Sequence, residues 1–512
     1  MLAGSFAMIK YSPFRSILLV ACLMGALLFP VTSPGYAATE QTLTLLFTND
    51  THNRLEPFEH LGLKKKVGGV IRRSRFFESV KKSNPQTLIL DAGDVFQGTP
   101  FYNFYLGEPD IRAMNIMGYD AMTMGNHDLD NGMLNLRKQV QYSHFPLLCA
   151  NVTEKSSGLL IFRPFQIFER QGLKIAVLGF LSEHAWQAVA QQRKEGYVFH
   201  DPVPIAKRLV AELRPKVDLI VSLHHMGIWY DEPFAQAVPG IDVILGGHSH
   251  TEMEQAKLIA NGSENGLGGT LVMHAGQMGA WVGRLDLTLD HRKHILHYSS
   301  ERVLMDETWD HQPLPEMLES YAQRLRADMQ KVIGESKSDF SVEGKYDGPF
   351  PLGSLLADIL RDSLKTEVGI MNTGGVRNGL NKGPIQVGEI FEILPFDNTS
   401  TAFEIQGDAL RKVVEISVSR LGVSKNLQFS GLVYTLKDKK LSEILINGKP
   451  LDPKRWYKVA APDYVFEGNE AIPFERPRNA VPSGRTLRDM MLEYLHTHRV
   501  IQAPSDPRLI RK

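Results

Sequence analysis

Short apolar runs alternate with polar stretches along the first part of the chain. Between Leu43 and about Leu304 the runs are rich in leucine and β-branched residues, and each is 4 to 7 residues long, the length of a buried strand. The strand candidates are Leu43–Phe47, Thr87–Leu90, Ala121–Met124, Lys174–Phe180, Leu219–Leu223, Ile241–Leu245 and Leu271–His274. Strands that alternate with helical stretches are typical of an α/β domain.

A helical pattern follows this segment. From Leu314 to Val332 apolar residues recur at a spacing of three or four, at Leu318, Tyr321, Leu325 and Met329, which predicts one amphipathic helix between two domains. A second α/β segment runs from about Phe340 to Ile501. Its predicted elements are a helix over Leu355–Leu364, a strand that enters a Gly-rich turn at Met371–Gly375, and strands near Ala402–Ile405 and Tyr457–Ala461.

The N-terminus has the pattern of a secretory signal. Lys10 and Arg15 are followed by an apolar run over Ile17–Phe29 and by small residues that predict cleavage after Ala37. The apolar run is shorter than the roughly 20 residues that cross a bilayer, which disfavours a permanent anchor. We therefore expect an exported protein, periplasmic or extracellular.

The two cysteines bear on membrane anchoring and on disulfide bonds. Leu19–Cys22 has the form of a lipidation box, but seven more apolar or small residues follow it, so a lipid anchor through Cys22 is the less favoured option. The C-terminal residues include no long apolar tail, which argues against a GPI signal. After cleavage only Cys149 remains, in an apolar stretch typical of a buried strand. A disulfide framework is therefore excluded.

The composition is that of a soluble globular protein. Of 512 residues 43% are hydrophobic and 22% charged, and 57 Lys and Arg balance 57 Asp and Glu, which argues against disorder, a collagen-like fibre and a polytopic membrane protein. Lys10 and Arg15 are the charged residues of the first 37, so the processed chain carries a net charge of −2. This balance gives no reason to expect a nucleic acid or a membrane surface as partner.

The length predicts more than one domain, because about 475 residues exceed what one core usually organises. We expect a signal peptide over residues 1–37, a first domain over 38–310, a connecting helix over 311–339 and a second domain over 340–512.

Five clusters of His, Asp, Asn and Gly follow the strand candidates of the first domain. They are Thr48–His52, Asp91–Asp94, Gly125–Asp130, His224–Gly227 and Gly246–His250. Each cluster alone fits a turn or a core histidine whose hydrogen bonds are satisfied. Five such clusters, each directly after a strand candidate, are not expected by chance. Imidazole, carboxylate and amide oxygen together suit zinc, manganese, iron or cobalt. Two such cations about 4 Å apart, sharing a carboxylate, lower the pKa of a trapped water for attack at phosphorus, and a spare histidine can serve the leaving oxygen.

In this order the clusters resemble the motifs of calcineurin-like metallophosphoesterases, and within them the exported bacterial 5′-nucleotidase/UDP-sugar hydrolase family. The motifs are Asn-Asp-x-His, Gly-Asp, Gly-Asn-His-Asp, His-Met-Gly and Gly-Gly-His-Ser-x. The resemblance implies that the first domain is a catalytic α/β/β/α sandwich of four layers. It implies one metal held by Asp50, His52 and His250 with Asp94, and a second held by Asn126, His225 and His248, with Asp94 bridging.

The resemblance also implies a role for His127, as transition-state stabiliser or acid oriented by Asp130. His224 is not carried by the motif, and its role stays open. At the position of His250 some relatives have Gln, so the metal preference could differ from theirs.

The second domain carries weaker signals. Arg377 follows a strand and a Gly-rich turn, which could meet an anion. Phe396 and Tyr464 lie on turns after prolines and could stack on a planar base, each stack worth about 1–3 kcal/mol. From the residues alone, packing in the core or at a domain interface is the favoured interpretation.

The family resemblance reverses that preference. It is carried here by Pro-Leu-Gly-Ser-Leu-Leu-Ala-Asp at residues 351–358, Asn-Thr-Gly-Gly-Val-Arg at 372–377 and Leu-Pro-Phe-x-Asn at 394–398. It implies a smaller α/β (α+β) nucleotide-specificity domain. In that domain Phe396 and Tyr464 would clamp the base, and Asn372 and Arg377 would contact the nucleotide.

The loop after Tyr464 departs from the family pattern. The family usually has Gly-Gly-Asp-Gly, whereas this chain has Gly468-Asn469-Glu470-Ala471. Asn469 tolerates a positive φ, but Ala471 would be strained there. Glu470 keeps the carboxylate, one methylene further out, and is the remaining candidate for substrate contact in this loop. A second arginine that some relatives have before the Pro-Leu-Gly stretch is not evident, since Gly344-Lys345-Tyr346 stands there, so we expect a shifted nucleotide preference.

The sequence thus predicts an exported hydrolase that uses two divalent metal ions (zinc, manganese or cobalt) to release phosphate from nucleoside 5′-monophosphates by attack of an activated water. The alternatives are a UDP-sugar hydrolase, a 2′,3′-cyclic nucleotide phosphodiesterase/3′-nucleotidase and a sulfur-ester hydrolase. A non-catalytic nucleotide-binding surface protein is the alternative of another class, and the presence of all candidate ligands argues against it. The expected partner is a small nucleotide, with no nucleic acid, no stable membrane insertion and a monomeric chain.

Overall fold

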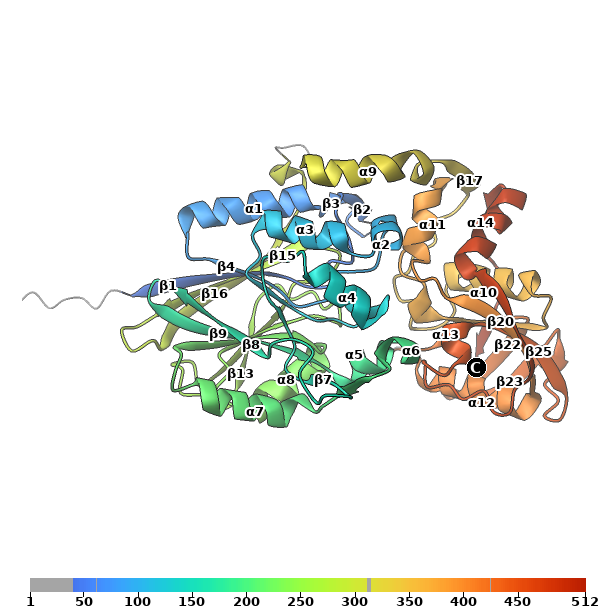
Figure 1. Ribbon diagram of the computed structural model, residues 1–512. Coiled ribbons are helices and arrows are strands. Elements are labelled where there is room, and N and C mark those ends of the chain that lie inside the picture. Colours follow the sequence, from blue (N-terminus) through green and yellow to red (C-terminus); the bar gives the residue numbers. More distant parts are fainter. Residues whose placement is uncertain (1–39, 61, 311–314, 424) are drawn as a thin grey trace, which may run out of the picture. The chain divides into compact units, whose positions relative to one another are not determined.

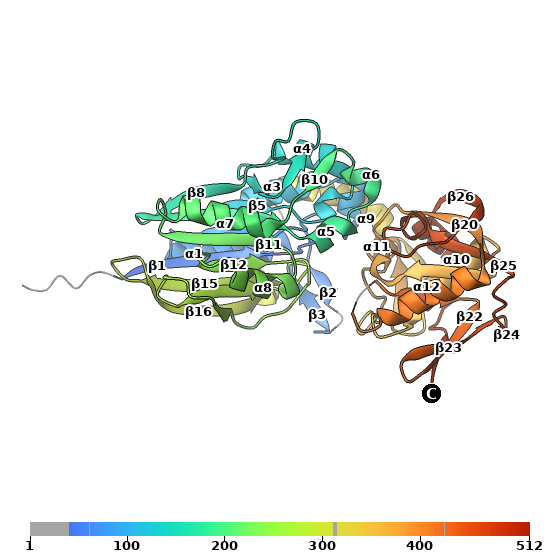
Figure 2. The same cartoon turned by 90° about the horizontal axis from the view of Figure 1, so that it is seen from below.

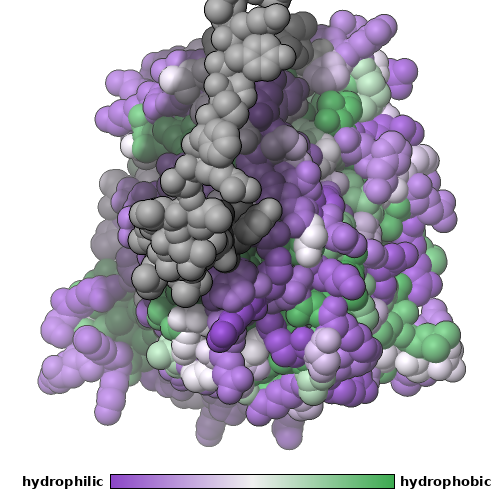
Figure 3. Space-filling view, turned by 90° about the vertical axis from the view of Figure 1, so that its left-hand side faces the viewer, coloured by the Kyte–Doolittle hydropathy of each residue, from purple (hydrophilic) through white to green (hydrophobic). Residues whose placement is uncertain are grey.

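A computed structural model describes residues 40–60, 62–310, 315–423 and 425–512. The predicted signal segment with Cys22, and the start of the predicted connecting helix at Leu314, lie outside these residues. Residues 40–512 form one compact unit. None of the described helices combines the length and the apolar character needed to cross a membrane. The face drawn in Figure 3 is mainly hydrophilic wherever described residues are visible, with apolar residues scattered over it.

Two six-stranded sheets form the centre of the first domain (Figure 1). The first has the order β16-β15-β1-β4-β5-β6 and the second β13-β14-β12-β11-β9-β8. Their strands are β1 (Gln41–Thr48), β4 (Leu88–Asp91), β5 (Ala121–Thr123), β6 (Leu147–Leu148), β8 (Phe165–Arg170), β9 (Leu173–Leu181), β11 (Leu219–His225), β12 (Val243–Gly246), β13 (Lys257–Ala260), β14 (Gly269–His274), β15 (Trp281–Leu289) and β16 (Ile295–Leu304). The inner strands of each sheet are parallel, whereas β8, β13, β15 and β16 pair antiparallel.

All seven predicted strands are present, with ends shifted by at most two residues. One consequence corrects the prediction: His224 and His225 lie inside β11 and not after it. Both histidines continue the ladder, since they pair with Phe180 and Leu181 of β9.

Alternate residues of each strand face different layers. Leu43, Leu45 and Phe47 pack in the core between the two sheets, together with Val177 and Val221 of the second sheet. The intervening residue Leu46 packs on the other side, against helices. Because both faces are covered, apolar residues occur on both sides of the strands, and the strands are mostly apolar in sequence.

Helices cover the outer face of each sheet (Figures 1 and 2). On the first sheet these are α1 (Val70–Ser83), α2 (Pro100–Tyr105), α3 (Glu108–Met117), α4 (Gly132–Val140) and α9 (Glu316–Met329), and on the second α7 (Pro202–Leu213) and α8 (Ile228–Ala237). Two short helices, α5 (Glu183–Ala188) and α6 (Gln191–Lys194), follow β9, and two small ribbons pair β2 (Phe58–His60) with β3 (Lys65–Val67) and β7 (Val152–Glu154) with β10 (Tyr197–Phe199). The layers are therefore α/β/β/α, as predicted.

The predicted connecting helix is shorter than expected. Helix α9 ends at Met329, and Leu318, Ala322 and Leu325 pack in the outer core of the first domain. Val332 begins strand β17 (Val332–Ser336), which pairs with β19 (Gly383–Gln386) and β27 (Val500–Ile501). The β-branched pair of Val332 and Ile333 favours this strand over a further helical turn.

The second domain is built on a five-stranded sheet of order β21-β18-β25-β20-β26. The strands are β18 (Val368–Asn372), β20 (Thr399–Gln406), β21 (Leu427–Ser430), β25 (Trp456–Pro462) and β26 (Arg478–Thr486). Helices α10 (Pro351–Ser363), α11 (Val387–Ile393) and α14 (Leu487–Thr497) pack in one core. Helix α12 (Gly407–Ser419) and the hairpin of β22 (Leu432–Lys437) and β23 (Lys440–Ile446) pack in another. Helix α13 (Asp463–Phe466) follows β25, and β24 (Lys449–Pro450) and β28 (Leu509–Arg511) complete the hairpin sheet.

Candidate metal centre

The carboxyl ends of the parallel strands bring the predicted ligands together. In parallel strands these ends lie at the same edge of a sheet, where sites commonly form. The seven predicted metal ligands follow or end β1, β4, β5, β11 and β12. Six of them form two groups whose ligand atoms lie within 4.8 Å of one another: Asp50, His52 and His250, and Asp94, His225 and His248. Asp94, which the resemblance implies as the bridging ligand, lies in the second group with His225 and His248.

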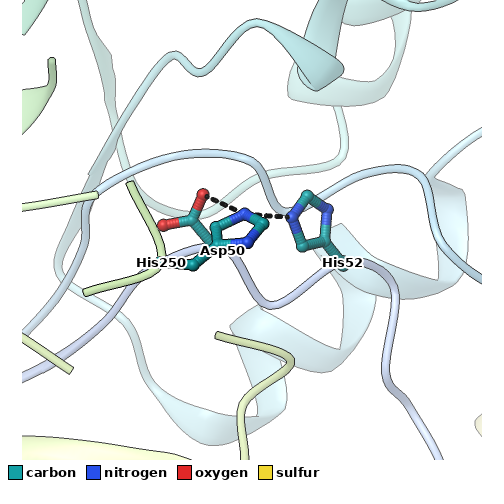
Figure 4. Close-up of side chains that lie close together, drawn as sticks. All are labelled: Asp50, His52 and His250. Carbon is teal, nitrogen blue, oxygen red and sulfur yellow. Dashed lines mark hydrogen bonds and ion pairs between the residues drawn. The ribbon is translucent and has the colours of Figure 1, made fainter. Parts of the chain in front are cut away.

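The first group centres on two imidazoles and a carboxylate (Figure 4). The Nε2 atoms of His52 and His250 are 3.1 Å apart, and His250 Nε2 is 3.3 Å from Asp50 Oδ1. Asp50 is fully buried, and its Oδ2 accepts hydrogen bonds from Asn49 Nδ2 at 2.7 Å and from the His248 backbone N–H at 2.9 Å. These bonds fix the carboxylate while Oδ1 faces the imidazoles.

The second group supplies acceptor atoms around one point. His225 Nε2 lies 3.1 Å from Asp94 Oδ2 and 3.2 Å from Asn126 Oδ1. Asn126 thereby joins the group. His225 Nδ1 donates to the Ala92 carbonyl at 2.8 Å, which leaves Nε2 as a lone-pair donor toward a metal. Nitrogen and oxygen acceptors that converge in this way need a proton or a cation between them.

The raised pKa of His225 also indicates that these acceptor atoms need a positive charge among them. Burial lowers its pKa, but the carboxylates of Asp94 and Asp50 outweigh burial and raise the pKa to about 10. Burial would also raise the pKa of Asp94, yet the neighbouring histidines His225 and His127 hold it well below its usual value. A divalent cation neutralises such an excess of negative charge as a proton does. The donor set therefore fits divalent metal ions.

Backbone conformation adds to this pattern. Five of the seven candidate ligands have a positive φ: Asp50 at 50°, His52 at 47°, Asp94 at 57°, His248 at 75° and His250 at 54°. Each such residue costs about 1–2 kcal/mol and persists where the surrounding structure enforces it, commonly at functional sites. Gly125 shows how closely the loops pack, because a Cβ there would lie 2.2 Å from Asp94 Oδ1.

His127 lies beside these groups without joining either. Its Nδ1 is 3.0 Å from Asp130 Oδ2, the residue that the family resemblance implies as its partner, and its backbone N–H donates to Asp94 Oδ1 at 2.7 Å. Burial lowers the pKa of His127, but the carboxylates of Asp130 and Asp94 reverse this and raise it above its usual value. The imidazole can therefore hold a proton, with Nε2 left for another partner.

Asp128 is a site residue that the sequence left without a role. It is fully buried and accepts backbone N–H bonds from Asp94, Val95 and Phe96 at 3.0–3.1 Å and from Gly125 at 2.8 Å. Its carboxylate thus joins the loop after β4 to the loop after β5. The only sequence signal was its place in the Gly-Asn-His-Asp motif.

His184 was missed as well. It lies on α5, and its Nδ1 is 2.7 Å from His248 Nε2. Burial, and to a lesser degree the charge of Lys425, lowers the pKa of His184 to about 4, so it meets His248 as a neutral ring. Nothing in Ser182-Glu183-His184-Ala185 sets it apart in sequence.

Two predicted substrate-binding residues of the second domain reach this centre. Arg377 Nη2 lies 3.3 Å from His52 Nε2. The ring of Phe396 stacks on His127, with centroids 5.6 Å apart. Tyr464 is half-buried and donates its hydroxyl to the Ala188 carbonyl of α5 at 3.0 Å.

The altered loop keeps its carboxylate in place. Glu470 is buried and accepts a hydrogen bond from Asn372 Nδ2 at 3.0 Å, and burial raises its pKa. Ala471 has a φ of 51°, so the expected strain is present, while Asn469 bonds back to the Tyr464 carbonyl. Lys345 donates to the Val376 carbonyl at 2.8 Å, and burial and the neighbouring Arg377 lower its pKa to about 7.

Comparisons with known proteins identify the architecture. Residues 43–252 match the calcineurin-like phosphoesterase family, and residues 332–475 match the 5′-nucleotidase C-terminal domain. The crystal structure of a 5′-nucleotidase precursor from Thermus thermophilus is 30% identical, with a TM-score of 0.84 over 92% of this chain and 99% of that one. The chain belongs to the 5′-nucleotidase family.

Other members of the 5′-nucleotidase family align over nearly the full length. A 5′-nucleotidase of Vibrio parahaemolyticus is 27% identical over 94% of both chains, and Protein UshA of Escherichia coli is 27% identical over 87% of this chain and 90% of its own. A Thermus thermophilus sulfate thiohydrolase, SoxB, shares the fold with a TM-score of 0.76 at 18% identity. Membership makes this 5′-nucleotidase-family chain a metallophosphoesterase, that is, a hydrolase that works with divalent metal ions.

Proposed function

We propose that the protein is an exported phosphohydrolase that holds two divalent metal ions and releases phosphate from nucleoside 5′-monophosphates. The observation that carries the proposal is the pair of ligand groups, each with imidazole and carboxylate atoms turned toward one point. Asp50, His52 and His250 would hold one ion and Asn126, His225 and His248 the other, with Asp94 between them. Nitrogen and oxygen donors without thiolate suit zinc, manganese or cobalt.

The ions and the histidine would divide the chemistry. Two bound divalent cations lower the pKa of a water and offset the charge that develops on the phosphoryl oxygens. His127 would give a proton from Nε2 to the leaving ester oxygen, while its Nδ1–H stays bonded to Asp130. Arg377, near His52, would contact the phosphate or the ribose with its planar fork.

We propose further that the two domains divide the work, residues 40–310 for hydrolysis and residues 332–512 for nucleoside binding. Support for the second role comes from Phe396, which lies against the proposed acid His127. Asn372 and Glu470, hydrogen-bonded to each other, would present polar atoms to the ribose.

The test of the function is phosphate release from a panel of substrates with added Mn²⁺, Zn²⁺ or Co²⁺. We expect AMP, UMP and GMP to be hydrolysed faster than UDP-glucose and 2′,3′-cyclic AMP. Faster hydrolysis of UDP-glucose or of 2′,3′-cyclic AMP would change the proposed substrate but would leave the proposed metal-dependent hydrolysis standing. No release from any compound by the wild-type protein would favour the non-catalytic nucleotide binder.

Alanine at Phe396 or Tyr464 is expected to raise KM for AMP about 10-fold, since a base–aromatic stack is worth about 1–3 kcal/mol. Hydrolysis of p-nitrophenyl phosphate, which has no nucleobase, should keep its KM and kcat. Steady-state kinetics with both substrates measures this. Tyr494→Ala is the control, because that ring stacks on His498 instead. An equal loss on both substrates would show that the two rings only support packing.

Export is expected to yield a chain that begins at Ala38. The basis is the apolar run over Ile17–Phe29 and the small residues before position 38. Intact-mass spectrometry of the protein isolated after secretion measures the cleavage point. A lipid-modified Cys22 at the N-terminus would instead select the anchored alternative.

A further inference from the structure

Three fully buried polar side chains form a chain of contacts beside the proposed ligands. His224, Asp231 and His274 each have 0% of their surface exposed. His224 Nδ1 lies 2.8 Å from Asp231 Oδ1, and His274 Nε2 lies 2.7 Å from Asp231 Oδ2. One carboxylate thus accepts one imidazole N–H at each oxygen. None of the three is in a candidate ligand group.

The three residues come from the elements that carry the ligand loops. His224 precedes the proposed ligand His225 at the end of β11. Helix α8 begins at Ile228, shortly after β11, and Asp231 lies in its first turn. His274 is the last residue of β14. Gly246, which ends β12 before His248, packs directly on the pair, since a Cβ there would lie 2.2 Å from His274 Nε2 and 2.3 Å from Asp231 Oδ2.

A fourth residue, Ser249, extends these contacts to the loop that carries the proposed ligands His248 and His250. The Ser249 hydroxyl there accepts the Ile228 backbone N–H of α8 at 3.2 Å and lies 3.5 Å from His274 Nδ1. The backbone of the same loop is joined to β11, because the Gly247 N–H donates to the His224 carbonyl at 2.8 Å. The ends of β11, β12 and β14 therefore share one buried polar connection.

The chemistry of this connection makes it stiff. Burial raises the pKa of Asp231, but the hydrogen bonds from His224 and His274 outweigh burial and bring the pKa below its usual value. An ionised buried carboxylate must keep its donors, because an unpaired charge in a low-dielectric interior is costly. His224 has its polar contact at Nδ1 and otherwise packs edge-on against Phe180 and Phe234. Neither the His224 ring nor the His274 ring can turn away without removing a hydrogen bond from the Asp231 carboxylate.

We propose that Asp231, through His224 and His274, is a positioning residue that holds the loops after β11 and β12 in register and so sets how tightly the centre binds a divalent cation. The inference rests on the proposed function for the identity of the ligands. Groups beyond the direct ligands commonly change metal affinity by 10–100-fold. Asp231 is expected to act in this way although it touches neither metal nor substrate.

The test compares two buried aspartates of the first domain, Asp231 of α8 and Asp242, which precedes β12. Asp231→Asn keeps the shape and removes the charge and one acceptor, and the apparent Kd for Mn²⁺ should rise about 10–100-fold. Asp242→Asn is the matched control. Asp242 is also 0% exposed and bonds to the Ile220 N–H, Arg214 and Asn265, but it precedes β12 at the end away from the ligand loops. Its Kd should equal that of the wild type.

Binding is measured by titrating the metal-free full-length protein with Mn²⁺ and following the free-ion electron paramagnetic resonance signal, together with the melting temperature of each metal-free variant. A second pair guards against misfolding of Asp231→Asn. His274→Gln retains an N–H donor toward Asp231 and should keep the wild-type Kd, whereas His274→Leu should weaken binding as Asp231→Asn does.

The outcomes separate the two proposals. Wild-type Kd in Asp231→Asn and in His274→Leu, or the same loss in Asp242→Asn as in Asp231→Asn, would overturn the positioning role and leave the proposed function standing. Equal losses in His274→Gln and His274→Leu would also overturn it, because packing alone would then explain them. Absence of Mn²⁺ binding by the wild type would overturn the proposed metal centre itself, and the inference with it.

Discussion

Replacing Asp94 with alanine is expected to lower kcat/KM for AMP about 10³-fold or more. Asp94 Oδ2 faces His225, and its Oδ1 accepts the backbone N–H of His127, so the change removes the carboxylate proposed to lie between both metals. Charge stabilisation by metal ions contributes several kcal/mol to such a reaction, and each 1.36 kcal/mol is a factor of ten. Initial rates of phosphate release and the metal content by mass spectrometry measure both effects.

The matched control for Asp94 is Asp120→Ala. Asp120 lies at the opposite end of the same sheet, where it accepts the Ile89 N–H and pairs with Arg170 at 2.7 Å. Its loss should lower the melting temperature and leave the rate per folded molecule unchanged. Wild-type activity in Asp94→Ala would refute the proposed role of Asp94 as the carboxylate between the two metals.

His127→Ala is expected to lower kcat for AMP about 100-fold or more, the usual contribution of a general acid, while the metal content stays that of the wild type. His127 contacts Asp130 and Phe396 and belongs to neither ligand group. If it protonates the leaving oxygen, p-nitrophenyl phosphate should lose much less, because its leaving group needs little protonation. Kinetics with the two esters separates this effect from a general loss of the site.

The exposed His144 provides the control for His127, since its alanine variant removes an imidazole from the surface. A loss of metal in His127→Ala would reassign this histidine as a ligand. An equal loss on both esters would indicate that it stabilises charge on the phosphate instead of protonating the leaving group.

Local sequence carried most of the fold of the first domain. Runs such as Leu45–Phe47 are apolar at every position because both faces of the sheet are covered, and that pattern can be recognised without knowledge of the neighbouring strands. That the candidate ligands lie close together could be predicted for a related reason, since polar residues directly after buried parallel strands collect at one edge of the sheet. The predicted end of the helix at Val332 was wrong, because Val332 begins β17, and β17 is stabilised by pairing with β19 and β27, far along the chain.

The remaining site residues depend on contacts that no local pattern encodes. Asp231 meets His274 across 43 residues, and His184 meets His248 across 64. Such pairs form only once strand order fixes which ends are neighbours. In the altered loop the sequence suggested that Asn469 could take a left-handed conformation, but Ala471 is the residue with the positive φ, next to the buried Glu470 that Asn372 holds.

The two ligand groups have a mechanical consequence for the sandwich. In each group some ligands come from the first sheet, as do Asp50 and Asp94, and some from the second, as do His250 and His225. A cation bound by either group would therefore cross-link the two sheets at one end of their shared core. The described residues contain one free thiol, and it is buried. The ions would therefore have the stabilising role that disulfide bonds have in many exported proteins. Chelation would loosen the two sheets first at the edge that carries the candidate ligands.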